Sequence, residues 1–170
     1  LPAVITVIAG ITEQMSQGEI RQLAHKGDLA LTEEIYLDVI RCKTAVLFQG
    51  ACRVGALISS APEPQAQALD DYGFHLGMAF QMADDLLDYT QASATLGKAA
   101  GADLREGKLT LPVIHALRAA ADADKQWMTA LIQGRDFTPA DFDGLVALLA
   151  RYGGIAYTRD CAADHIRRAK

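Results

Sequence analysis

The chain has 170 residues, 51% of them apolar and 22% charged, a balance typical of one globular domain with a sizeable core. The net charge is −5 and no block of Lys or Arg stands out, which argues against nucleic acid as the main partner. Three scattered cysteines provide neither a disulfide framework nor metal-ligand spacing, and the apolar stretch 1–11 is too short for a transmembrane segment, so a cytoplasmic setting is expected.

Helix-period patterns dominate, and strand signals are weak throughout. We expect helices over 3–24, 33–60 and 65–90, a polar Gly-rich connection over 91–110, and further helices after Thr110 and over 123–133, 139–151 and 155–169. Thr32 and Thr110 are the expected caps, and Pro112 is tolerated in a first turn. Because no repeat or linker is visible, residues 1–170 are predicted to form a single all-α domain.

An acidic helix end is the strongest candidate for chemistry. Asp84 and Asp88 are four residues apart, so their carboxylates share one helix face, which Gln81 extends by a turn. Like charges at this spacing repel, and the C-terminal end of a helix disfavours negative charge, so with Asp85 these acids call for a compensating cation. Hard oxygen ligands suit Mg²⁺, which is often shared with substrate phosphates. The alternative is an ordinary solvated helix end or a cap for the next element.

A lysine interrupts an otherwise apolar helical stripe. The stripe comprises Tyr36, Ile40, Lys43, Leu47, Ala51, Val54 and Ile58. A buried lysine is costly unless it is paired, and a bound anion would pair Lys43, with the Thr44 hydroxyl as a further donor. The alternative is a lysine that reaches the surface or pairs with a protein carboxylate.

Two Gly-Lys pairs, Gly97-Lys98 and Gly107-Lys108, follow the acidic helix. Glycines let backbone amides approach a ligand closely, and lysines bind phosphate as point charges. The P-loop spacing is absent because Leu109 follows Lys108, and a flexible polar loop remains the alternative. The four histidines lie on separate elements and are interpreted as structural or surface residues. Together, the aspartates and lysines predict a site for a Mg²⁺-bound diphosphate that carries an apolar tail.

These motifs resemble the trans-prenyl diphosphate synthase family. Its second aspartate-rich motif is similar to Phe80-Gln81-x-x-Asp84-Asp85-x-x-Asp88, its Lys-Thr pair to Lys43-Thr44, and its lysine segments to Gly97-Lys98 and Asp103-x-x-x-Gly107-Lys108. The resemblance extends from about residue 4 to the end of the chain. It implies an isoprenoid synthase fold with helices around a central cavity, a homodimer and Mg²⁺ dependence.

The resemblance also implies two groups of site residues. The expected metal ligands are Asp84, which would bind the ion directly, and Asp85 and Asp88, which would act as further ligands or as supports for it. The residues expected to hold the allylic diphosphate are Lys43, Thr44, Gln81, Lys98 and Lys108. Of these two groups, Lys43, Asp84 and Lys98 are the expected catalytic residues.

The implied activity joins an allylic prenyl diphosphate to isopentenyl diphosphate. Because segment 103–112 resembles bacterial polyprenyl members, we expect a medium- or long-chain, octaprenyl-like product for a quinone side chain. No Asp-Asp-x-x-Asp precedes Asp84, so the chain is expected to be the C-terminal half of a longer synthase and inactive alone. The alternatives are a non-catalytic subunit of a heteromeric synthase, a class I terpene cyclase and a helical interaction module.

Overall fold

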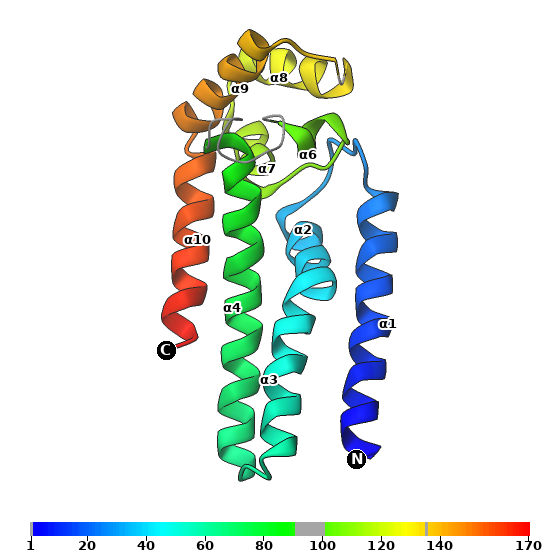
Figure 1. Ribbon diagram of the computed structural model, residues 1–170. Helices are drawn as coiled ribbons and strands as arrows, with labels where there is room; N and C mark the ends of the chain where they lie inside the picture. The colour runs from blue at the N-terminus through cyan, green and yellow to red at the C-terminus, as the bar shows by residue number, and fades with distance from the viewer. Residues whose placement is uncertain (1, 91–100, 135) are drawn as a thin grey trace. The chain divides into compact units, whose positions relative to one another are not determined.

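The computed structural model describes residues 2–90, 101–134 and 136–170. Every regular element in these ranges is helical, which confirms the predicted all-α class (Figure 1). The helices are α1 Pro2–Ala24, α2 Glu33–Ile40, the π-helical turn η1 Arg41–Ala45, α3 Val46–Ile58, α4 Glu63–Thr90, α6 Ala102–Arg105, α7 Leu111–Ala119, α8 Asp122–Gly134, α9 Pro139–Arg151 and α10 Gly154–Arg168. Element α6 lies within the segment that the sequence analysis assigned to a connection.

The helices form two compact units. Unit 1 contains Leu1–Leu23, Leu37–Gln81 and Cys161–Lys170, and unit 2 contains Ala24–Tyr36 and Met82–Asp160. Helix α4 continues from one unit into the other, and the division falls directly before its acidic end.

In unit 1, the π-helical turn η1 interrupts the helix predicted over 33–60. A π-helical turn holds an extra residue, so it rotates every later side chain relative to an unbroken α-helix. Before the turn the predicted apolar stripe is correct, since Tyr36 and Ile40 are each 3% exposed. After the turn it is wrong, because Leu47 and Ile58 are exposed. The buried residues of α3 are Val46, Gly50 and Ala56. The buried face of α3 therefore begins one position earlier than predicted, at Val46 and Gly50.

Helix α4 approaches η1 closely at Gly77. A Cβ atom at this position would lie 2.6 Å from the Cα of Ala45, well inside van der Waals contact. The glycine lets the helix backbone approach the segment that carries Lys43 and Thr44. The close packing of unit 1 here therefore depends on the absence of one methyl group.

Replacing Gly77 with alanine is expected to lower the free energy of unfolding by about 1–3 kcal/mol, because the new methyl group overpacks backbone against backbone. Urea unfolding followed by circular dichroism measures this change. Gly55→Ala is the matched control, since a Cβ at this position of α3 has nothing within 4 Å. It should raise stability by about 0.5–1 kcal/mol. An unchanged or increased stability of Gly77→Ala would contradict the close approach.

Two histidines of unit 1 join α4 to α10. The Nδ1 atoms of His75 and His165 lie 2.8 Å apart, and the ring of Phe74 packs edge-on against both. Burial lowers the pKa of each imidazole, with the charge of Arg168 acting in the same direction. The pair therefore forms a packing contact between α4 and α10.

Helix α7 lies in the buried core of unit 2. The side chains of Leu111, Val113 and Ala116 on this helix are fully buried. Thr110 occupies the cap position before α7 with extended backbone, as predicted, and a proline lies in the first turn. Its hydroxyl makes no cap hydrogen bond and instead lies 2.9 Å from the hydroxyl of Tyr89. The Thr110 hydroxyl, which was predicted to cap α7, therefore contacts the buried Tyr89 instead.

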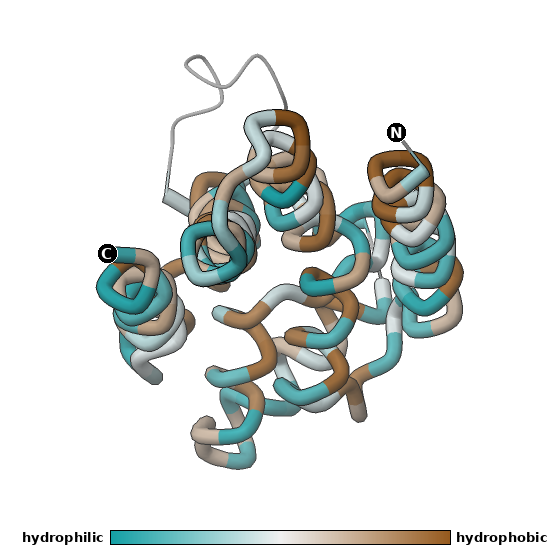
Figure 2. The backbone as a smooth tube through the Cα atoms, turned by 90° about the horizontal axis from the view of Figure 1, so that it is seen from below, coloured by the Kyte–Doolittle hydropathy of each residue, from teal (hydrophilic) through white to brown (hydrophobic). Residues whose placement is uncertain are grey.

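Polar residues recur along the helices when the backbone is coloured by hydropathy (Figure 2). None of the helices within the described ranges is both long and apolar enough to cross a bilayer.

Candidate functional site

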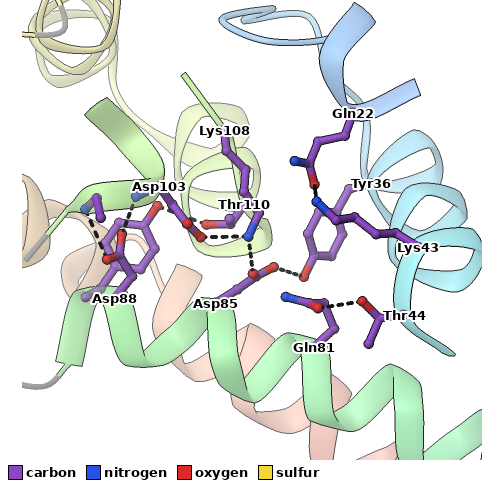
Figure 3. A network of polar contacts seen from close by, with 12 residues as sticks. Gln22, Tyr36, Lys43, Thr44, Gln81, Asp85, Asp88, Asp103, Lys108 and Thr110 are labelled. Carbon is purple, nitrogen blue, oxygen red and sulfur yellow. Dashed lines mark hydrogen bonds and ion pairs between the residues drawn. The ribbon is translucent and has the colours of Figure 1, made fainter. Parts of the chain in front are cut away.

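The acidic end of α4 is anchored in unit 2 by Asp85. Its side chain is fully buried, and Oδ2 accepts a hydrogen bond of 2.7 Å from the hydroxyl of Tyr36. Oδ1 lies 2.7 Å from Nζ of Lys108, which lies at the same distance from Asp103 Oδ2 (Figure 3). The ammonium group of Lys108 therefore bridges the carboxylates of Asp85 on α4 and Asp103 on α6.

Burial and charge both shift the pKa of two members of this network, Lys108 and Tyr36. Burial by itself lowers the pKa of Lys108, but the carboxylates of Asp85 and Asp103 outweigh it and leave the pKa well above its usual value. Burial raises the pKa of Tyr36, and the charge of Asp85 raises it further. The lysine is therefore a permanent cation and the tyrosine a permanent hydrogen-bond donor at neutral pH.

Asp88 contacts the start of α6. Its two carboxylate oxygens accept hydrogen bonds from the backbone N–H groups of Ala102, at 3.1 Å, and Asp103, at 3.2 Å. Gly101 precedes them with a φ of 75°, a left-handed conformation that glycine adopts without strain. Burial raises the pKa of Asp88, and the nearby charge of Asp103 adds to this effect. The side chain thus caps the next element, one of the alternatives that the sequence left open.

Asp84 differs from its two neighbours because its side chain is exposed. No group of three or more His, Cys, Asp or Glu side chains arranged to hold a metal ion occurs in the described part of the chain. Mg²⁺ is commonly held by only one or two carboxylates, with water and substrate phosphate as the other ligands. The exposed side chain of Asp84 therefore fits Mg²⁺ as a single protein ligand.

In unit 1, Lys43 lies on η1 and contacts helix α1. Its Nζ lies 2.7 Å from Glu19 Oε2 and 3.2 Å from Gln22 Oε1. The side chain is 36% exposed, so a ligand could reach the ammonium group. This arrangement is the carboxylate pairing that the sequence analysis left open as an alternative to a bound anion.

Thr44 and Gln81 form a second contact within unit 1. The threonine hydroxyl donates a 2.7 Å hydrogen bond to the side-chain oxygen of Gln81 on α4 (Figure 3). Both residues are partly exposed. The π-helical turn is therefore bonded through adjacent residues to two different helices, by Lys43 to α1 and by Thr44 to α4. Rare π-helical turns occur often at functional sites.

The sequence did not identify every member of these groups. Tyr36 was interpreted as part of an apolar stripe, and its hydroxyl gave no signal because Asp85 is 49 residues away in the chain. Asp103 was noted in a lysine segment without a role of its own. Lys98, predicted to hold the diphosphate, lies outside the described residues.

The sequence profile of a family described as "Polyprenyl synthetase" matches residues 2–149. The octaprenyl diphosphate synthase of Escherichia coli K12 is 40% identical over 169 residues, which cover 98% of this chain and 51% of that protein.

Two solved structures are also similar. A decaprenyl diphosphate synthase from Rhodobacter capsulatus matches with a TM-score of 0.90 and 43% identity, covering 99% of this chain and 52% of that one. A polyprenyl synthase from Caulobacter crescentus CB15, complexed with calcium and isoprenyl diphosphate, matches with a TM-score of 0.92 and 39% identity, covering 98% and 51%. The chain therefore spans about half the length of these relatives, and the matches confirm the fold expected from the sequence.

Proposed function

This chain belongs to the polyprenyl synthetase family, and we propose that it is the C-terminal portion of a synthase that joins an allylic prenyl diphosphate to isopentenyl diphosphate. The observation that carries the proposal is the contrast at the end of α4. There Asp85 is buried against Lys108 and Tyr36, and Asp84 is left exposed. A helix end of this kind is rigidly held and still offers an oxygen ligand to a substrate-bound cation.

Asp84 would hold Mg²⁺, with Asp85 and Asp88 supporting the helix end on which it lies. When bound, the ion would offset the negative charge that grows on the diphosphate leaving group. Asp85 keeps the helix end in place through its contacts with Lys108 and Tyr36. Asp88 fixes the start of α6 through two backbone N–H groups.

The lysines would hold the allylic diphosphate. Lys43 exchanges its contact with Glu19 for the diphosphate, and its partial exposure supports this role. Thr44 and Gln81 assist as polar neighbours, and Lys98 adds a second cation. Lys108 contributes positive charge while it remains bonded to Asp85. Cationic donors fixed in position before the reaction stabilise developing charge without reorganising.

The family and the length of the relatives support a wider assignment. We propose a cytoplasmic homodimer that contains this chain as a helical domain and that makes a medium- or long-chain, octaprenyl-like product. The chain alone would show little turnover, because the first aspartate-rich motif of the family is not in its sequence. The octaprenyl and decaprenyl synthases among the similar proteins support the longer product.

Product chromatography tests both the activity and the chain length. The chain, extended by its upstream sequence, is incubated with farnesyl diphosphate, labelled isopentenyl diphosphate and Mg²⁺. We expect labelled products of octaprenyl-like length and none when Mg²⁺ is chelated. The 170-residue chain is the matched control and should give almost no product. No magnesium-dependent product from the extended protein would refute the activity, and a labelled product that stops after a single condensation, at geranylgeranyl, would refute the chain length alone.

A further inference from the structure

Unit 2 contains a cavity of about 300 Å³ that none of the candidate site residues lines. Its apolar walls come from the loop before α2 and from the segment that includes α7. The wall residues are Leu29, Leu31, Leu109, Ile114 and Leu117. This volume lies at the lower end of the range for small-molecule sites, about 300–1,000 Å³. The cavity is therefore large enough for a compact ligand with an apolar body.

Two cationic side chains line this cavity. Arg118 at the end of α7 and Lys125 on α8 line it, and both are exposed. Neither forms an ion pair with any carboxylate in the described ranges. With Glu33 as the one acid of the described lining, the two cations leave it with a net positive charge, which favours an anionic ligand.

The other polar groups of the lining are compatible with an anion. Glu33 is the acid among the described lining residues, and its Oε1 already accepts a 2.6 Å hydrogen bond from Tyr157. The ring of His115 stacks on the same tyrosine at 4.2 Å, which fixes both rings. Hydroxyl groups of Thr32 and Thr129 add possible donors. The polar groups thus provide both the charge and the hydrogen bonds that an anionic head group needs.

We propose that this cavity binds an amphipathic anion, with its apolar body against the leucines and its phosphate or carboxylate head between Arg118 and Lys125. A guanidinium group can donate two parallel hydrogen bonds to such a head, and a lysine adds a point charge. The inference does not depend on the proposed synthase activity, because it uses only contacts within unit 2. It also requires no metal ion.

Calorimetry on the 170-residue chain in EDTA tests the proposal. Geranyl monophosphate and octanoate are the phosphate and carboxylate probes, and geraniol lacks the charged head. We expect saturable one-to-one binding of at least one anionic probe, with geraniol weaker by about tenfold or more. Arg118→Ala should weaken binding of the anion about tenfold. Ala30→Trp should abolish it, because Ala30 is an exposed lining residue and the indole would fill the cavity.

Two control variants make the result specific. Arg159→Ala removes the same charge from an exposed position on α10 in the same unit, and Asp84→Asn alters the proposed metal ligand. Both should bind the probe as the unmodified chain does, and circular dichroism checks that all variants are folded. The proposal is overturned by an absence of saturable binding up to millimolar probe. It is also overturned by an equal loss in Arg159→Ala, or by binding that requires Mg²⁺ and Asp84.

Discussion

Replacing Lys108 with alanine is expected to lower the free energy of unfolding by about 3–5 kcal/mol, because the change leaves a buried carboxylate without its ammonium partner. Asp85 is fully buried, and the side chain of Lys108 is only 17% exposed, so solvent screens the pair weakly. Urea unfolding followed by circular dichroism measures the change.

A second substitution separates charge from packing. Adding Asp85→Asn to Lys108→Ala should recover much of the lost stability, since the double variant no longer buries an unpaired charge. Lys26→Ala, at an exposed loop position of the same unit, should change stability by no more than about 0.5 kcal/mol. If the double variant were as unstable as the sum of its two single variants, Lys108 and Asp85 would not act as a pair.

Asp84→Asn in the extended enzyme is expected to reduce kcat about 10²- to 10³-fold, the range measured when one preorganised electrostatic contact to a transition state is removed. The side chain is exposed, so the free energy of unfolding should change by no more than about 0.5 kcal/mol. Steady-state turnover and urea unfolding of the same preparation give the two quantities. The expected signature is a large loss of turnover with normal stability.

Neighbouring aspartates provide the controls for this experiment. Asp85→Asn should lower stability, because this carboxylate is buried against Lys108 and Tyr36. Asp143→Asn, at an exposed position on α9, should alter neither turnover nor stability. Normal turnover in Asp84→Asn, or an equal loss in Asp143→Asn, would show that Asp84 is not the metal ligand.

The helices themselves were largely predictable. The bounds predicted for the helix over 139–151 agree with α9, and those of α1, α4, α8 and α10 differ by one or two residues. The positions at which these helices begin and end depend on local signals such as prolines, glycines and the helical period. The π-helical turn was not predicted. A single inserted residue does not change the composition of a helix, and its effect on the direction of the later side chains is seen only in the folded structure.

The sequence by itself determined the all-α class and the order of the motifs, because helical period and motif spacing are local properties of the chain. Only the tertiary structure decided that Asp84 is exposed while Asp85 is buried, although the two are identical in chemistry and adjacent in sequence. Asp85 can be buried because Tyr36 and Lys108, which come from distant segments of the chain, donate hydrogen bonds to its carboxylate. A carboxylate can be removed from water only where the folded chain provides such partners, and spacing within one helix cannot reveal them.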